Sequence, residues 1–476
     1  MIRAITSGSL PQQTVTRYHV YSSKRKAEYG KKRKGGRIGI WEEQKMGNSQ
    51  SNSTNPRFDL AKRQFLSNTS NGYTVEAFTE RKLEDLKSLF DSLAAQSQSN
   101  GKYVSPSVFK AYIGVEGPLG DRMFDLVTQK RKDQKLTFED LVIAKGTYEK
   151  GSNADIEEFI YQLLDVFDDG VVGRSDLEAV LTAVLRNISS HESHQAEPSS
   201  DREVLDIFLN AANLTMDDTK CAESCMSFEE FRSWCARLPS VRKFLGTLLS
   251  PRDSGSEVPM LVYPENIDPA VILLRKEYAW HIGGALPQDE LHEWRLLYHS
   301  TVHGLSFSTF LGNISNDKGP TLLVIKDKEG YIYGGYASQP WEKHADFYGD
   351  MKSFLFQLYP KASVYRPTGA NSNLQWCATH FSSESIPNGI GFGGRAHHFG
   401  LFISANFDQG HTFTCTTFGS PSLSKTHQIY PEVIECWGVA IKRAQDNQDR
   451  LQGTVLERFK EDRHMLNMVG LANSSE

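Results

Sequence analysis

The stretch of residues 387–438 constrains the fold most, because short apolar runs alternate there with glycine, proline and asparagine. The runs cover residues 400–403, 412–418 and 433–437 and consist largely of β-branched and aromatic residues. Runs of this kind, separated by turn-forming residues, are typical of consecutive antiparallel strands. We therefore expect this part of the chain to form a mainly antiparallel β structure.

Three glycines in this stretch, Gly389, Gly391 and Gly394, have the spacing of a dinucleotide-binding loop. That loop works only when a helix follows and its N-terminus holds the pyrophosphate. Only residues 395–399 separate the glycines from the next apolar run, which is too short for a stable helix. We interpret the glycines instead as a tight loop between strands, where glycine permits a positive φ or a close backbone approach.

The totals describe a chain of 476 residues, long enough for two or three domains. Hydrophobic residues make up 39% and charged residues 23%, as in soluble globular proteins. A net charge of −5 predicts no basic stripe, so we expect no nucleic-acid partner. Six cysteines are too few for a disulfide framework and are expected to be reduced thiols.

Residues 1–78 are expected to be a disordered N-terminal segment. Basic clusters at 24–26 and 31–34 leave three interpretations open: a transit peptide, a nuclear-localisation patch, or sequence upstream of a start at Met46. The first two would place the protein in an organelle or the nucleus. The third would make it a cytoplasmic protein peripheral on endomembranes.

Met46 is followed by a sequence that satisfies the N-myristoylation pattern, with Gly47 as the acylated residue and Ser51 at the required position. The alternative is a linker rich in serine and asparagine. A single myristoyl chain binds membranes only marginally, so a peripheral protein would need a second contact.

Residues 79–240 are predicted to be helical, with apolar residues at helical spacing from Leu83 to Leu93. The segment reads as four units, each made of a helix, a polar loop, a short apolar stretch and another helix. Units of this kind resemble EF-hands, which occur in pairs. We expect a degenerate, EF-hand-like helical domain.

One of these loops, residues 165–176, is a candidate calcium site. Asp165 stands at loop position 1, Asp169 at position 5, and Asp176 at position 12. Phe167 occupies position 3, where a carboxylate is expected, and Asp176 is shorter than the usual bidentate glutamate. We therefore favour a structural helix pair over a calcium site, and expect no cofactor.

Residues 241–262 have the composition of a linker, with Pro251, Gly255 and Pro259. After them we predict a helix over 286–298, because Leu291 and Trp294 fall on one helical side. A β-hairpin is predicted over 321–336, with its turn at 327–330.

Residues 263–439 resemble a TLDc domain, the module shared by the oxidation-resistance family. The resemblance rests on the opening stretch and on a set of further positions. They are Gly334, Gly335, Tyr336, Trp341, Phe354, Leu355, Phe356, Leu358, Gly369, Asn371, Asn373, Gly391, Gly393, Gly394, Thr417, Phe418, Gly419, Pro421, Leu423, Ser424, Glu435, Trp437 and Gly438. The branch of the family with EF-hand-like repeats and an acylated start is the most similar.

The resemblance implies an α+β protein, with a helical module followed by an antiparallel β-sandwich flanked by short helices. It also implies contact with the vacuolar proton-pumping ATPase, and a link to oxidative-stress resistance and to lysosomal growth signalling of the mTOR type. We expect a monomer.

Residues 440–476 are predicted to be a C-terminal helix and tail. Apolar residues fall near one face at Leu451, Val455, Phe459 and Leu466. This face either folds back on its own domain or inserts into a groove of a partner. In the resembled branch, a C-terminal helix contacts the proton pump.

Catalytic machinery is sparse in the sequence. A metal-hydrolase motif, a nucleophile elbow and a Walker loop are all absent. His397 and His398 have no accompanying nucleophile, so we interpret them as loop residues. Cys377 and Cys415 leave a thiol-dependent peroxide-handling enzyme as the alternative, although strand positions favour buried, inert thiols. The preferred function is a non-catalytic interaction protein.

Overall fold

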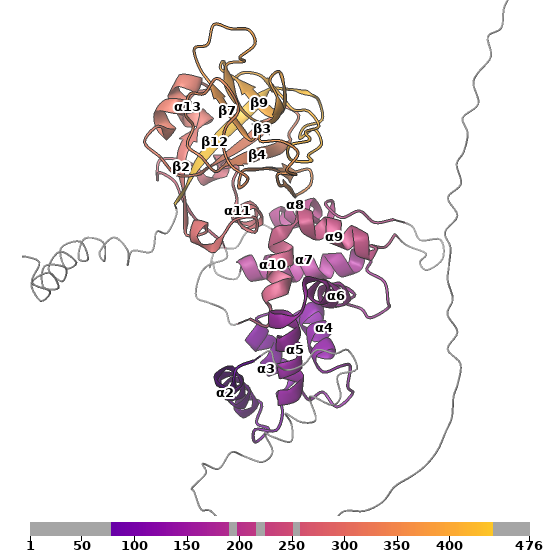
Figure 1. Cartoon of the computed structure of the whole chain (residues 1–476). Coiled ribbons are helices and arrows are strands. Elements are labelled where there is room, and N and C mark those ends of the chain that lie inside the picture. The colour runs from indigo at the N-terminus through magenta and orange to yellow at the C-terminus, as the bar shows by residue number, and fades with distance from the viewer. Residues whose placement is uncertain (1–77, 190–197, 216–223, 251–257, 441–476) are drawn as a thin grey trace, which may run out of the picture. The chain divides into compact units, whose positions relative to one another are not determined.

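The computed structural model describes residues 78–189, 198–215, 224–250 and 258–440 (Figure 1). All of them belong to one compact unit, Asp59–Glu476. The described residues form helices followed by two β-sheets, which confirms the predicted α+β class. No helix among them is long and apolar enough to cross a membrane.

The N-terminal half of the described chain is helical. Its helices are α2 (Glu80–Gln96), α3 (Pro106–Ile113), α4 (Gly117–Val127), α5 (Phe138–Lys150), α6 (Asn153–Leu164), α7 (Arg174–Ser189), α8 (Pro198–Leu209), α9 (Phe228–Arg237) and α10 (Pro239–Thr247). Consecutive helices from α2 to α9 form four helix–loop–helix units. A single antiparallel bridge joins the loops within each pair of units, Val104 to Leu136 in the first pair and Gly173 to Cys225 in the second. EF-hand identity for these units stays a prediction.

Three of the helices begin with a reciprocal capping box, in which the side chains of the N-cap residue and of the residue three positions later each bond the other's backbone N–H. The pairs are Thr137 with Asp140, Ser152 with Asp155, and Ser227 with Glu230. Each box satisfies donors that have no partner within the helix. Local sequence therefore sets where α5, α6 and α9 start.

The predicted linker over 241–262 is wrong at both ends. Residues 239–247 form helix α10, which starts with proline and buries Val241, Phe244 and Leu245 at helical spacing. Residues 260–262 form strand β1. The proline, glycine and serine content of the middle of this stretch obscured the apolar spacing of its first part.

The β region contains two sheets (Figure 1). The seven-stranded sheet has the order β1 (Met260–Val262), β2 (Glu293–His299), β12 (Pro431–Ala440), β3 (Thr321–Asp327), β4 (Ile332–Ala337), β5 (Phe354–Tyr359) and β6 (Ser363–Tyr365). The five-stranded sheet has the order β11 (Gln428–Ile429), β10 (Gly410–His411), β9 (His398–Ser404), β8 (Gly389–Arg395) and β7 (Gln375–Ala378). All pairings are antiparallel except the one between β1 and β2.

Alternate residues of β3 face two different cores, as the period of two in a strand requires. Leu323 and Ile325 belong to the core that includes Phe392 of β8, between the two sheets. Leu322 and Val324 belong to the other core, which also contains apolar residues of helix α11 (Lys276–Gly283). Short helices, α12 (Ser300–His303) and α13 (Phe307–Ile314), follow β2. Two 3₁₀ helices, Pro269–Val271 and Gln288–Glu290, precede it.

The predicted helix over 286–298 is wrong in its second half, where β2 lies between β1 and β12. Trp294, Leu296 and Tyr298 are buried, and Arg295 between them is exposed. The apolar residues of this stretch fit both periods, so the spacing alone did not decide between helix and strand. The hairpin predicted over 321–336 is confirmed as β3 and β4.

The glycines of 389–394 lie in strand β8 and not in a loop between strands. A Cβ at Gly391 would stand 2.7 Å from the Leu401 carbonyl oxygen of the neighbouring strand. Gly393 and Gly394 have φ values of 66° and 83°, which side chains rarely adopt. The expected reasons for glycine, close approach and positive φ, are therefore both present, within a strand.

Candidate functional site

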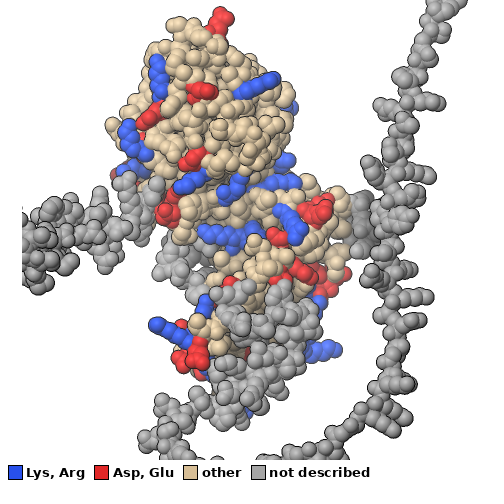
Figure 2. Space-filling view, viewed as in Figure 1, with Lys and Arg blue, Asp and Glu red and all other residues tan. Residues whose placement is uncertain are grey.

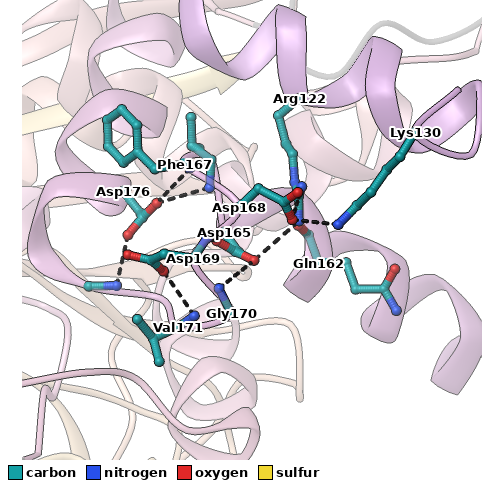
Figure 3. Close-up of polar contacts among 12 residues, drawn as sticks. Arg122, Lys130, Gln162, Asp165, Phe167, Asp168, Asp169, Gly170, Val171 and Asp176 are labelled. Atoms are coloured by element: carbon teal, nitrogen blue, oxygen red, sulfur yellow. Dashed lines mark hydrogen bonds and ion pairs between the residues drawn. The ribbon is translucent and has the colours of Figure 1, made fainter. Parts of the chain in front are cut away.

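The loop that joins α6 to α7 holds the three aspartates predicted as calcium candidates (Figure 3). Asp165 caps the end of α6 and accepts backbone hydrogen bonds from Asp169 at 3.1 Å and from Gly170 at 3.3 Å. Its Oδ2 also lies 3.2 Å from the guanidinium of Arg122 on α4. The Asp165 carboxylate is therefore already engaged by donors of the protein.

Asp176, in the first turn of α7, is 2% exposed and turns back into the loop. Its Oδ1 accepts from the backbone N–H groups of Val166 (2.9 Å) and Phe167 (3.2 Å), and its Oδ2 accepts from that of Gly173 (2.9 Å). Burial raises the pKa of the Asp176 carboxyl, and these three hydrogen bonds act in the opposite direction. The side chain thus fixes the loop backbone from within.

The geometry does not fit calcium. A calcium ion in such a loop needs oxygen ligands that converge on one point. Here Asp169 accepts from the backbone of Val171 at 3.0 Å, and Phe167, at position 3, is 56% exposed. Within the described ranges, no cluster of three or more histidine, cysteine, aspartate or glutamate side chains could hold a metal ion. The loop is ordered by its own hydrogen bonds.

The two cysteines considered for peroxide chemistry are buried in the β region. Cys377 on β7 is 1% exposed, and burial raises the pKa of its thiol to about 12. Cys415 is 2% exposed, and its Sγ would lie 2.6 Å from a Cβ at Gly393. Since the thiolate is the reactive form, the raised pKa makes the Cys377 thiol less reactive than a free thiol at neutral pH.

We expect the Cys377 thiol to react with an aromatic disulfide reagent far more slowly in the native protein than in guanidinium chloride. At a pKa of about 12, on the order of one Cys377 thiol in 10⁵ is ionised at pH 7. The rate is measured by absorbance, with Cys377→Ser identifying the contribution of this residue.

In cells, the Cys377→Ser, Cys415→Ser double variant should retain full peroxide protection. Loss of protection by a folded double variant would restore the enzyme hypothesis.

Two histidines beside the glycine-rich strand, His398 and His411, belong to an aromatic array. His397 lies in the turn between β8 and β9 with a φ of 63°, and the ring of His398 stacks on Phe413 with centroids 4.0 Å apart. His411 on β10 stacks on Phe402 at 5.1 Å. Burial, together with His398 and His397, lowers the pKa of His411 to about 4. Ring packing therefore accounts for His398 and His411, whereas His397 is an exposed turn residue.

Glu435, Trp437 and Gly438 of the predicted structural motif lie on the central strand β12. The Glu435 carboxylate is fully buried and accepts hydrogen bonds from the backbone N–H groups of Leu273 (2.5 Å) and Leu274 (3.2 Å). It also accepts from the Trp437 indole at 2.9 Å. His299 Nε2 is 3.5 Å away. The carboxylate therefore holds an irregular, partly buried segment against the sheet.

Gly334 and Gly335 on β4 leave room for a neighbouring strand and for a ring of the opposite sheet. A Cβ at Gly334 would stand 1.8 Å from the Leu323 carbonyl oxygen of β3. One at Gly335 would stand 2.7 Å from the ring of Phe392, which belongs to the other sheet. On β12, a Cβ at Gly438 would meet the Asp317 carboxylate at 2.2 Å. A side chain would have to displace backbone at Gly334, a packed ring at Gly335 and the Asp317 carboxylate at Gly438.

The comparison with protein families identifies this β structure. Residues 270–440 match the model described as the TLDc domain. The chain carries a TLDc domain. The sequence predicts this domain over 263–439, and the family match covers 270–440. All of the predicted structural-motif glycines, together with Glu435 and Trp437, fall inside the TLDc domain.

Relatives of the chain share more than the TLDc domain. It is 32% identical over 278 residues to the MTOR-associated protein MEAK7 of Xenopus laevis, covering 54% of this chain and 57% of that protein. It is 26% identical over 455 residues to the Gallus gallus protein of the same name, which covers 86% of this chain and 96% of that protein. It is 28% identical over 214 residues to oxidation resistance protein 1 of Mus musculus, and this alignment covers 44% of this chain and 24% of that protein. The first of these alignments spans a little over half of the relative.

Other predicted site residues are not placed by the structure. The acylation candidate Gly47 and the partner-binding candidates Leu451, Val455, Phe459 and Leu466 lie outside the described residues. So does the C-terminal helix predicted over 440–476, except for Ala440, which is the last residue of strand β12. Sequence reasoning missed Arg122 altogether. It precedes Asp165 by 43 residues, so no local spacing connects the two.

Proposed function

We propose that the chain is a non-catalytic interaction protein that binds and modulates the vacuolar proton-pumping ATPase. Its place of action would be the endolysosomal or vacuolar membrane, with a link to oxidative-stress resistance and to growth signalling. Support comes from the TLDc domain, from the resemblance to the oxidation-resistance family, and from relatives named as MTOR-associated and oxidation resistance proteins.

The observation that carries the proposal is how the TLDc domain uses its polar and reactive groups. The buried Glu435 carboxylate accepts hydrogen bonds from backbone and indole N–H groups, and the Cys377 thiol is buried with a raised pKa. Aromatic rings fill the space between the sheets, as where Trp341 meets Phe392 with centroids 5.5 Å apart. A scaffold of this kind presents a surface to a partner rather than a reaction centre.

The external surface is consistent with protein contact. On the face shown in Figure 2, acidic and basic side chains are interspersed and leave broad uncharged areas between them. That face has no continuous basic stripe of the kind that binds nucleic acid. A cleft of about 590 Å³ in the TLDc domain is lined by Glu290, Asp317, Lys318 and Ala440. Strand β12 ends at Ala440, which is one of the residues that line this cleft.

A binding experiment tests the partner. The full chain should retain the purified pump in a pull-down, and removal of residues 441–476 should reduce the amount bound by about tenfold or more, as expected when an apolar helix anchor is lost. Leu451→Asp with Phe459→Asp should have a similar effect, because both remove apolar anchors. Gln452→Asp with Lys460→Asp is the matched control and should bind normally. Retention of no pump by the full chain would refute the proposed partner.

Membrane attachment through Gly47 is a separate part of the proposal. We expect the native protein to begin at Gly47 and to carry one myristoyl group, which intact mass measurement detects. Gly47→Ala should shift the protein from the membrane to the supernatant fraction, since it removes the acylation site. A native chain that begins at Met1 would contradict this. The basic N-terminal segment would then again be a candidate transit peptide or nuclear-localisation signal.

A further inference from the structure

Arg122 connects the two pairs of helix–loop–helix units. It lies on α4, in the first pair, and is only 5% exposed. Its Nε donates to the carbonyl oxygen of Gln162 at 3.1 Å, in the last turn of α6. Its two terminal nitrogens reach the loop that follows, Nη2 to Asp165 at 3.2 Å and Nη1 to Asp168 at 2.6 Å (Figure 3). One guanidinium thus serves a helix terminus and two carboxylates.

The position of this guanidinium matters because of what the loop would otherwise hold. In a calcium-binding loop of this length, the residue at position 1 supplies a carboxylate to the ion. Here the position-1 carboxylate, Asp165, faces a buried positive charge from elsewhere in the chain. Lys130 adds a second, exposed cation to Asp168 at 2.5 Å.

The loop of the preceding unit has a similar arrangement. Arg131 forms a two-pronged pair with Asp140, with Nη1 to Oδ1 at 2.9 Å and Nη2 to Oδ2 at 2.5 Å. The same Nη2 donates to the carbonyl oxygen of Lys135 at 2.8 Å. Asp140 is 3% exposed. At both loops, therefore, an arginine of the chain itself binds a carboxylate and a backbone carbonyl. The carbonyl is that of Gln162 in helix α6 for Arg122 and that of Lys135 in the loop for Arg131.

We propose that Arg122 takes the place of a calcium ion in the loop of residues 165–176, so that this unit keeps one conformation whether or not calcium is present. The planar guanidinium supplies a permanent positive charge in a fixed geometry. A calcium ion that bound Asp165 would have to displace Arg122, which would then be buried without its partners. The unit formed by α6 and α7 is therefore a constant support and does not sense calcium.

The same contact gives Arg122 a second consequence. Because α4 belongs to the first pair and Asp165 and Asp168 to the second, the ion pairs fix one pair of units on the other. In a calcium sensor, ion binding changes the angle between the helices of a unit. In this chain, the ion pairs of Arg122 with Asp165 and Asp168 hold the two pairs of units in one arrangement.

Calcium titration of the full chain is the direct test. We expect the same melting temperature in excess EGTA and at about 1 mM calcium chloride, a concentration that saturates sensor-type loops. We also expect no heat in isothermal titration. A melting temperature that rises with calcium, with the rise lost in Asp165→Ala, would overturn the proposal.

A pair of variants isolates the role of Arg122. Phe167→Asp with Asp176→Glu supplies the two ligands that the loop lacks, and this double variant is compared with a triple variant that also carries Arg122→Ala. We expect the triple variant to bind calcium at least about tenfold more tightly, because the competing cation has been removed. Lys130→Ala in place of Arg122→Ala is the matched control and should have less effect, since Lys130 is exposed.

Calcium affinities are compared only between variants that have the same helical circular dichroism signal as the wild type. Equal calcium affinity in the double and triple variants, or no binding by either, would show that Arg122 is not what excludes the ion. The wild-type titration remains decisive if the triple variant does not fold. Pump binding is measured separately, so that its failure leaves this test unaffected.

Discussion

Glu435→Ala is expected to lower the free energy of unfolding by about 3–5 kcal/mol, the range for removing one partner of a buried charged network. The substitution leaves three donors without this acceptor: the half-buried backbone N–H of Leu273, the buried backbone N–H of Leu274 and the buried indole N–H of Trp437. Each such donor costs about 1–3 kcal/mol when it is left unpaired. Urea unfolding followed by tryptophan fluorescence measures the loss.

Glu435→Gln is the matched variant, because it keeps the shape and one acceptor oxygen while it removes the charge. We expect a smaller loss than for alanine. Although burial opposes it, the hydrogen bond from His299 to Glu435 raises the pKa of the His299 ring. The pKa of His299, followed by NMR, should therefore fall in Glu435→Gln. A loss below 1 kcal/mol for Glu435→Ala would mean that the segment carrying Leu273 is not held by this carboxylate.

Acidification is expected to destabilise the protein through His281. This residue of α11 is fully buried, with its ring 5.4 Å from that of Phe208, and burial lowers its pKa to about 3, which the backbone of Ser363 opposes only in part. The unfolded chain binds a proton below about pH 6.5, and the folded chain does not do so until about pH 3. The free energy of unfolding contributed by this site therefore falls by about 2 kcal/mol between pH 7 and pH 5.

The comparison of variants isolates this contribution from that of other groups. His281→Phe removes the titrating ring, so its stability should fall less steeply than that of the wild type over the same pH range. His292→Ala, at an exposed position, should leave the slope unchanged. His411 has a pKa lowered in the same direction and should add to the acid sensitivity. Parallel pH profiles for wild type and His281→Phe would exclude a role for His281.

Features encoded by short-range patterns could be read from the sequence. The hairpin of β3 and β4 combines apolar runs with a turn at residues 327–330, so both its strands and its register are local. The family resemblance rested on scattered glycines and aromatics, and Gly334 and Gly335 show why such residues are distinctive. Each fills a position where another strand or ring leaves no space for a side chain.

Features decided by tertiary contacts could not be read in this way. The apolar residues preceding Tyr298 fit a helix as well as a strand, and the choice is made by pairing with β1 and β12. In the candidate site, Phe167 and the short Asp176 already indicated a poor calcium loop. Arg122 was beyond sequence reasoning, because its contact with Asp165 depends on how two helix pairs pack.

The position of β12 has a consequence for synthesis of the protein. Residues 431–440 form the last strand among the described residues, yet they lie between β2 and β3 inside the seven-stranded sheet. Until the ribosome has delivered them, β2 and β3 each expose a backbone edge flanked by apolar side chains, which is the kind of surface that aggregates. The nascent chain should therefore require chaperone protection late in translation, and a premature stop codon before position 431 removes the centre of the sheet rather than its margin.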